Sequence, residues 1–225
     1  RPAVSVKGLT AGKDYTVSYE NNINAGTAKV IVTGIGRYHG EIEKTFIIRK
    51  ASQSITAKSY TKTYGDKAFS LGARAKTKLS YRSGDARTAS VSSGGKVTIN
   101  GPGKATIAIA AAATGNYNGA SKNITITVKP KKVTLKKAKS QKARSLQVIW
   151  KRDKKATGYQ VVIARDKKFK KGKKTALIRK NKTVSKTFKK LKRKKTYYYK
   201  VRAYKKVGNS MIYGAYSNTK RVKVK

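Results

Sequence analysis

Cysteine is absent from this 225-residue chain, and histidine and acidic residues are scarce, with one His and 8 Asp plus Glu. Without thiols there is neither a disulfide framework nor a cysteine-based zinc site. A nucleophilic triad could be built only on His39, and eight acids offer few ligands for Mg²⁺ or Ca²⁺ and few carboxylate pairs for glycoside hydrolysis. We therefore expect a protein that is not an enzyme, with no metal site and no cofactor.

Long apolar runs are also missing. No run approaches the roughly 18 residues that span a bilayer, so we expect no membrane insertion. The first residues, Arg1-Pro2-Ala3-Val4, lack the basic-then-apolar layout of a signal peptide. Because the chain opens directly on strand-like residues, we expect it to be a fragment whose targeting signals lie outside it.

Alternation of apolar residues indicates the fold class. Leu, Ile, Val and Phe make up only 44 of the 225 residues, which is borderline for a folded chain of high net charge. However, apolar residues recur at every second position, as in Ile107 and Ile109 or Tyr159, Val161 and Ile163, and no helical stripe is present. Turn residues separate these runs at intervals of roughly 8 to 12 residues. The sequence therefore predicts an all-β protein built from several small β-sandwiches.

An internal repeat predicts the domain organisation. A strand, a Gly-x-Tyr-x-Gly turn at residues 36–40 and a closing strand recur around the similar turn at residues 115–119. The spacing of roughly 80 residues is typical of tandem sandwich domains rather than of a solenoid. We predict boundaries near Lys50 and Pro130, which give modules 1–50, 51–130 and 131–225 in an extended arrangement. Their net charges are +4, +10 and +34.

The first two modules carry recognisable motifs. Asp14-Tyr15-Thr16-Val17-Ser18-Tyr19, Asn24-Ala25-Gly26-Thr27-Ala28 and Gly34-x-Gly36-x-Tyr38-x-Gly40 cover most of residues 1–50. This pattern resembles a repeat of large surface proteins of Gram-positive, often gut, bacteria. Residues 51–130, with Tyr64-Gly65-Asp66 and Gly115-Asn116-Tyr117-Asn118-Gly119, resemble bacterial Ig-like domains of the same proteins. The resemblance implies an extracellular protein, secreted or associated with the cell wall.

The first module is short for a sandwich. Such repeats normally have an additional N-terminal strand, so the resemblance implies that module 1–50 is a truncated bacterial Ig-like repeat. Residues 1–50 supply only four strand-like runs, near Val4, Val17, Val30 and Ile47, where a sandwich usually has about seven. We expect its core to be partly open on one side.

The last module resembles fibronectin type III. Trp150 closes an alternating run where that family places its strand B tryptophan. Leu191, Tyr197, Tyr199, Val201 and Ala203 have the spacing of its strand F signature, and the resemblance makes Tyr197 the candidate tyrosine corner. The usual Pro-Gly after the leucine is Arg193-Lys194 here. No Arg-Gly-Asp motif is present, so integrin binding is not implied.

The excess of cations in residues 131–225 points to a binding partner. Solubility requires a net charge of magnitude about 2 to 8 for a small domain, and self-repulsion at +34 costs stability. In a type III topology three loops meet at one pole, and they would contain 17 cations. The candidate polyanion-binding residues are Lys136, Lys137, Lys139, Lys142, Arg144, Lys167, Lys168, Lys170, Lys171, Lys173, Lys174, Lys189, Lys190, Lys192, Arg193, Lys194 and Lys195.

These features together predict a non-catalytic stalk and attachment region. We expect a monomer whose third module docks on an anionic cell-wall polymer, such as teichoic acid, or on an acidic glycan. Nucleic acid could be attracted by the same charge, but nothing predicts sequence-specific recognition. The alternative is an adhesin that binds a host protein, such as a glycoprotein or an immunoglobulin, through strand edges or loops. Docking on a polyanion predicts that affinity falls steeply as the salt concentration rises, whereas the adhesin alternative does not.

Other motifs have simpler interpretations. His39 lies at the variable position of a turn, and Glu41 and Glu43 share one strand face, where ion pairing is far commoner than catalysis. Gly94-Gly95-Lys96 lacks the spacing of a phosphate loop and predicts a hairpin turn. Among the tyrosines, Tyr198 should be the one free ring of the Tyr197 to Tyr199 run. Tyr213 and Tyr216 are the better candidates for an exposed aromatic platform, although strand packing is an equal alternative.

Overall fold

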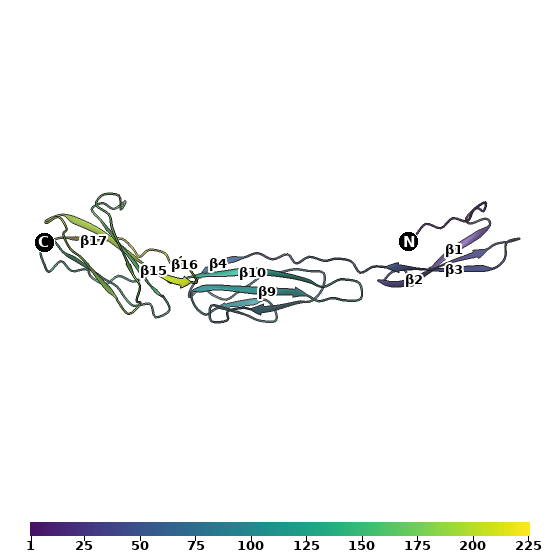
Figure 1. The fold of residues 1–225 in the computed structure, drawn as a ribbon, viewed down its shortest axis with the longest axis horizontal. Helices are drawn as coiled ribbons and strands as arrows, with labels where there is room; N and C mark the ends of the chain where they lie inside the picture. Colours follow the sequence, from purple (N-terminus) through teal and green to yellow (C-terminus); the bar gives the residue numbers. More distant parts are fainter. The chain divides into compact units, whose positions relative to one another are not determined.

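The chain contains β-strands and no helix. The computed structural model describes residues 1–225, and its 17 strands form the sheets drawn in Figure 1. The predicted all-β fold is therefore confirmed. The chain divides into two compact units, one of residues 1–56, 73–80 and 109–122 and the other of residues 57–72, 81–108 and 123–225. No segment forms a helix with the length and apolarity needed to cross a bilayer. The module boundaries near Lys50 and Pro130 stay predictions.

The first sheet is an antiparallel meander with the order β1-β2-β3. Its strands are β1 (Tyr15–Glu20), β2 (Gly26–Gly34) and β3 (Glu41–Ile48). Alternation places Tyr15, Ala28 and Val30 on one face, and all three are buried. Ile42 of β3 pairs with Val32 and belongs to the same face, but it is 61% exposed. That face of the sheet is therefore only partly covered.

The predicted strand near Val4 is not formed. The chain turns instead, because the Leu9 amide donates to the Val6 carbonyl at 3.1 Å. The segment is held to the sheet by the Tyr19 hydroxyl, which donates to the Pro2 carbonyl at 2.6 Å. A turn so close to Val4 leaves too few residues for a ladder, and the other three predicted runs are confirmed as strands.

The middle of the chain forms a four-stranded sheet and a three-stranded sheet. The larger sheet has the order β4-β10-β9-β6, in which β4 and β10 are parallel. Its strands are β4 (Tyr60–Thr63), β6 (Leu79–Ser83), β9 (Gly103–Ala111) and β10 (Ala120–Lys129). The smaller sheet, in the order β5-β8-β7, contains β5 (Phe69–Ser70), β7 (Ala89–Val91) and β8 (Lys96–Ile99). Burial alternates along all of β9, with Ala105, Ile107 and Ile109 inside. The period-two pattern in the sequence therefore predicted this strand correctly.

Residues 131–225, called the C-terminal segment below, form the remaining two sheets. One pairs β11 (Leu146–Ile149) with β14 (Ser185–Phe188). The other has the order β13-β12-β15-β16, and β17 also pairs with β15. Its strands are β12 (Gly158–Ala164), β13 (Lys174–Ile178), β15 (Thr196–Val207), β16 (Ser210–Tyr213) and β17 (Lys220–Lys223). All pairings in both sheets are antiparallel.

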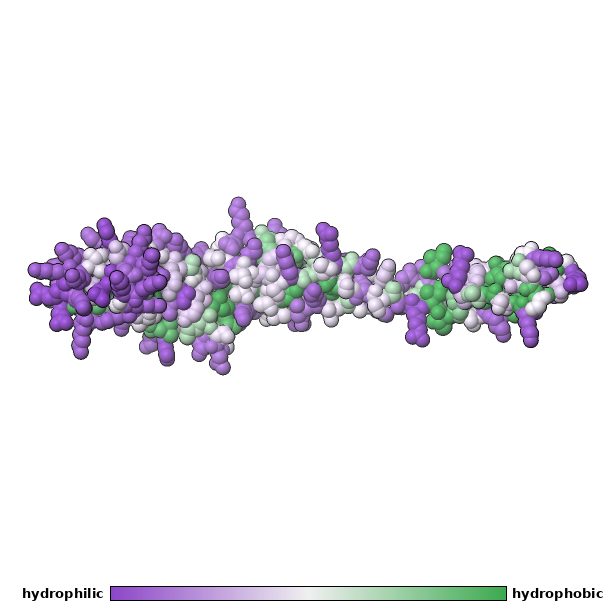
Figure 2. All heavy atoms as spheres, turned by 90° about the horizontal axis from the view of Figure 1, so that it is seen from above, coloured by the Kyte–Doolittle hydropathy of each residue, from purple (hydrophilic) through white to green (hydrophobic).

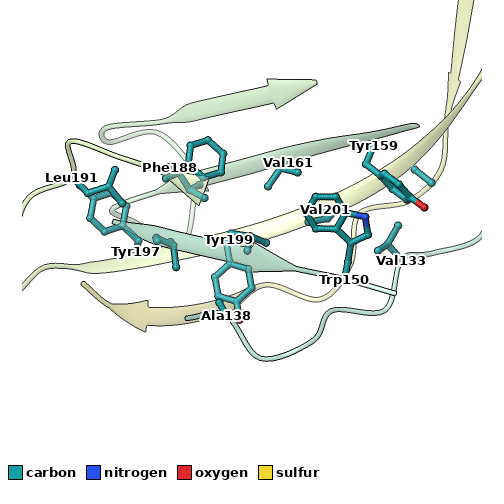
Figure 3. Close-up of a cluster of buried hydrophobic side chains, with 14 of the residues drawn as sticks. Val133, Ala138, Trp150, Tyr159, Val161, Phe188, Leu191, Tyr197, Tyr199 and Val201 are labelled. Carbon is teal, nitrogen blue, oxygen red and sulfur yellow. The ribbon is translucent and has the colours of Figure 1, made fainter. Parts of the chain in front are cut away.

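One apolar cluster holds the C-terminal segment together. Trp150 is fully buried, and its ring lies 5.2 Å from that of Tyr159. Figure 3 shows Val161, Leu191 and Val201 in the same cluster, contributed by different strands and loops. Aromatic and branched residues on the inward face of each strand supply most of the buried area, which is the main stabilising contribution in a small domain.

The turn before β15 has the tyrosine-corner geometry that the sequence predicted. Tyr197 is 4% exposed, and its hydroxyl accepts a hydrogen bond from the Lys192 amide at 3.1 Å. Leu191, just before this amide, is buried in the core. The hydroxyl thereby fixes the lysine-rich loop 189–195 to the start of β15, even though Arg193-Lys194 replaces the usual Pro-Gly.

We expect Tyr197→Phe to lower the free energy of unfolding by about 1 kcal/mol, because the Lys192 amide loses its acceptor. Trp150 is the only tryptophan and is buried in this core, so its fluorescence during urea titration reports the loss. Tyr198→Phe is the matched control, because the Tyr198 hydroxyl has no hydrogen-bond partner in the chain; we expect a change within about 0.5 kcal/mol. Equal losses in the two variants would contradict the assigned role.

Candidate functional site

The cations of the C-terminal segment have no anionic partners within the chain. The chain has two ion pairs, Lys29 with Glu43 and Arg87 with Asp85, and neither lies in the C-terminal segment. Figure 2 shows hydrophilic side chains over most of the visible face of this segment, at the left of the view. The segment has 36 Lys and Arg against 2 Asp. Its positive charge is therefore left for solvent ions or a bound polyanion to balance.

Both carboxylates of the segment bind backbone amides instead of lysine side chains. Asp166 accepts hydrogen bonds from the amides of Lys170 and Lys171, and Asp153 accepts one from the Lys155 amide at 2.9 Å. The Lys171 amide, and after it the Lys170 amide, hold the pKa of Asp166 below its usual value. The two acids thus stabilise loops, and neither forms an ion pair with a lysine or arginine side chain.

Strand pairing brings three cation-bearing loops to one end of the segment. We call the loops 140–145, 165–173 and 189–195, with residues 223–225, the basic pole. The Arg144 amide donates to the Lys225 carbonyl at 2.8 Å, and the Leu191 amide donates to the Arg144 carbonyl at 3.0 Å. Loop 165–173 joins β12 to β13, and the Lys174 ammonium at its end donates to the Lys189 carbonyl at 3.2 Å. Thirteen of the 17 candidate cations therefore belong to these loops, and Lys139 and Lys174 border them.

Lys136, Lys137 and Lys139 lie before this loop and not within it, which corrects their predicted placement. The Lys136 amide donates to the Ile149 carbonyl, and the Lys139 amide donates to the Gln147 carbonyl. These residues therefore run alongside β11 instead of forming part of the loop. The reason is burial of Val133 and Ala138, which draws the segment against the core and extends it.

Several residues of the basic pole have left-handed backbone conformations. Arg144, Phe169, Lys190 and Lys194 have φ values of 55°, 57°, 55° and 55°. This conformation costs a non-glycine residue roughly 1 to 2 kcal/mol, and glycine usually occupies it. Lys190 and Lys194 therefore add charge to the loop at the cost of backbone strain. Backbone strain of this kind is typical of functional loops.

Two loops of the basic pole enclose an open depression of about 540 Å³. Lys142 and Arg144 line one side, and Thr187, Lys189 and Lys190 line the other. The Arg144 guanidinium also bonds to the Leu191 carbonyl at 3.4 Å, so this side chain partly serves to join the two loops. Lys142, Lys189 and Lys190 are exposed and are free to contact an anion.

The aromatic platform predicted at Tyr213 and Tyr216 is already covered by cations of the chain itself. Arg202 lies 3.9 Å from the centre of the Tyr213 ring and 4.5 Å from that of Tyr216. Lys200 lies 4.3 Å from Tyr216 and 4.1 Å from Phe169. Burial and then the charges of Lys173 and Arg202 lower the pKa of Lys200. We call this row of alternating rings and cations the cation–aromatic ladder; it packs the outer face of the sheet and offers no free ring.

The remaining motifs behave as local structure. His39 is exposed, and Glu43 forms the surface ion pair with Lys29, as predicted for this strand face. Gly95 has φ 74° in the hairpin turn between β7 and β8, where its amide donates to the Ser92 carbonyl. The hairpin interpretation of this glycine pair is therefore confirmed. No group of three or more His, Cys, Asp or Glu side chains is placed to hold a metal ion.

No protein-family model and no curated protein matches the chain. Among solved structures, a segment of two fibronectin type III domains from chicken tenascin is 13% identical over 94% of this chain and 98% of its own, with a TM-score of 0.46. Three fibronectin type III domains of another chicken protein are 13% identical over 90% of this chain and 77% of theirs, with a TM-score of 0.37. A human fibronectin type III domain is 19% identical over 41% of this chain and 72% of its own, with a TM-score of 0.32. None of these similarities bears on function.

We expect Lys194→Gly to raise the free energy of unfolding by about 0.5 kcal/mol, because glycine relieves the left-handed strain at a smaller entropic cost. Lys192→Gly is the matched control: it removes the same charge from the same loop, but Lys192 has no positive φ. We expect it to lower stability by about 0.5 to 1 kcal/mol. Urea titration followed by Trp150 fluorescence measures both. Stabilisation by both variants would show that charge alone, without backbone strain, limits stability.

Loop 165–173 should lose order in acid. Because the folded state lowers the pKa of Asp166 from 3.8, its carboxylate stabilises the loop above that pH, and the contribution is lost as pH falls through the lower folded value. We expect the amide proton resonances of Lys170 and Lys171 to be constant from neutral pH to about pH 4 and to shift below it. An Asp166→Asn variant should abolish this titration in NMR spectra. A persisting titration in the variant would assign it to another group.

Proposed function

We propose that the C-terminal segment binds an anionic cell-wall polymer or an acidic glycan through the basic pole. The observation that carries this proposal is the absence of any ion pair among its 36 cations, since both acids are engaged by backbone amides. A bound polyanion would neutralise repulsion that the chain itself leaves unbalanced. The rest of the chain serves as a non-catalytic stalk, and the resemblance of residues 1–50 to bacterial surface repeats favours an extracellular setting.

Loop 189–195 is the part of the basic pole best suited to bind a polymer. Six of its seven residues are cations, namely Lys189, Lys190, Lys192, Arg193, Lys194 and Lys195, and all six are exposed. The hydrogen bonds from Lys192 to Tyr197 and from Lys194 to Val224 fix the loop backbone while the charged side chains extend into solvent. Lysine ammonium groups bind phosphate or sulfate as point charges, so affinity comes from counterion release and not from recognition of a sequence.

The test replaces these six cations by Gln in the full chain and measures retention on immobilised heparin and on teichoic acid. We expect the variant to elute at much lower salt than the native chain. For comparison, a protein that makes six phosphate contacts on a nucleic acid loses about 10³-fold in affinity between about 50 and 200 mM salt. We expect a salt dependence of this size for the native chain.

A matched control removes six exposed cations from the other end of the same sheets. These are Lys151, Lys154, Lys155, Arg179, Lys180 and Lys182, which follow β11 and β13 or precede β12 and β14. The net charge changes by the same amount in both variants. Equal losses of retention would show that only bulk charge matters and would overturn the basic pole as a site. Binding of a host protein that resists high salt would favour the adhesin alternative.

A further inference from the structure

A second cavity of the C-terminal segment combines cations with an uncovered aromatic ring. It is an open pocket of about 820 Å³, lined by Lys137, Lys167, Tyr198, Thr219, Lys220 and Arg221, with the buried Tyr199 behind it. We call it the Tyr198 pocket. Only Lys137 and Lys167 were among the candidate cations. Its volume falls within the range of about 300 to 1,000 Å³ typical of small-molecule sites.

The fold assembles this pocket from four separate stretches of sequence. Tyr198 of β15 pairs with Arg221 of β17 on one side and with Ala164 of β12 on the other. Because directly opposed residues project from the same sheet face, the ring of Tyr198 and the side chain of Arg221 are neighbours. Extension of residues 135–139 along β11 brings Lys137 to the pocket, so the feature that removed it from the basic pole gives it this place.

Tyr198 differs from the other aromatic residues of the outer face. The cation–aromatic ladder covers Phe169, Tyr213 and Tyr216, whereas no cation of the chain stacks on Tyr198. One side of Tyr198 packs against the small cluster of Val162, Ala164 and Phe169, which fixes the ring. Its hydroxyl has no partner within the chain, and the residue is half-buried. The ring is therefore fixed in place and accessible from the pocket.

An aromatic floor surrounded by cations has a definite chemical preference. The face of a ring takes the apolar C–H face of a sugar, while its hydroxyl and that of Thr219 can exchange hydrogen bonds with sugar hydroxyls. Arg221 can bind a carboxylate or a sulfate with two parallel hydrogen bonds, and the lysines add charge. We propose that the Tyr198 pocket is a subsite for one sugar unit of an acidic polysaccharide, stacked on Tyr198 with its carboxylate or sulfate at Arg221.

This inference rests on the proposed function and narrows it to one class of polymer. A polyol phosphate or an inorganic polyphosphate supplies anionic groups but no ring to cover Tyr198, so the basic pole alone would bind it. An acidic polysaccharide can engage the basic pole with its charges and the Tyr198 pocket with one of its rings. Selection of sugar over phosphate therefore depends on Tyr198.

The test measures the Kd of the full chain for a heparin-derived tetrasaccharide and for inorganic polyphosphate at low salt. We expect Tyr198→Ala to weaken tetrasaccharide binding about tenfold and to leave polyphosphate binding within twofold of the native value. Tyr213→Ala is the matched control, because its ring is already covered by Arg202, and it should change neither Kd by more than twofold. Trp150 fluorescence verifies folding. If Tyr198→Ala does not fold, Tyr198→Leu retains the packing and removes the ring.

A second pair of variants tests whether Arg221 binds the anionic group of the sugar. Arg221→Gln should weaken tetrasaccharide binding more than Arg179→Gln, which removes the same charge from an exposed position after β13, outside both the pocket and the basic pole. Equal effects of these two variants, or equal loss of both ligands from Tyr198→Ala, would overturn the inference. Binding of polyphosphate without binding of the tetrasaccharide would overturn it and leave the basic pole intact. Binding of neither ligand would overturn both proposals.

Discussion

The buried cluster around Trp150 must hold together a segment of net charge +34. Apolar burial is the only large stabilising term available to it, because the segment has no disulfide and no ion pair. The loops of the basic pole are joined to this core by main-chain hydrogen bonds, such as those from Arg144 to Lys225 and from Lys194 to Val224. Main-chain bonds tolerate any side chain, so the lysine side chains can extend into water while the loop backbone remains fixed.

The two acids of the segment likewise bond to the loop backbone and leave the lysine side chains unpaired. A carboxylate beside a lysine ammonium at an exposed site contributes at most about 1 kcal/mol to stability. Asp166 instead bonds to the amides of Lys170 and Lys171, where it closes a loop that carries five of the candidate cations. The Tyr197 hydroxyl does the same for loop 189–195 through Lys192. The polar groups that stabilise the basic pole therefore leave its charge unbalanced.

Features with a local signal could be predicted from the sequence, and features that depend on distant partners could not. The period-two burial of β9 and the tyrosine corner at Tyr197 follow from spacing within one strand and its turn. The position of Lys136 depends on pairing with β11, which the lysine run itself does not encode. The turn at residues 6–9 is an exception, because it is closed by a local hydrogen bond from Leu9 to Val6 with Gly8 at φ 77°, and the apolar residues around Val4 suggested a strand instead.

The environments of the aromatic residues were harder still to predict, because the rings and cations of the cation–aromatic ladder come from several segments of the chain. Lys200 and Arg202 have the spacing of exposed strand positions, and only their neighbours show that they cover Phe169, Tyr213 and Tyr216. The sequence correctly placed Tyr198 outward as the free ring of its run, between the buried Tyr197 and Tyr199. It failed for Tyr213 and Tyr216, because the ladder covers both rings.

Charge and fold make different contributions to the proposed binding. An unfolded chain with the same lysines would also attract a polyanion, and binding to the unfolded state reduces any stabilisation of the folded one. Flexible lysine side chains therefore bind a polyanion almost equally well in the folded and the unfolded chain. They also distinguish little between sugar polymers and phosphate polymers. Tyr198 and Arg221 are far apart in the sequence and become neighbours only when β15 pairs with β17. Counterion release at the basic pole can supply strength, but only groups positioned by strand pairing can supply selection.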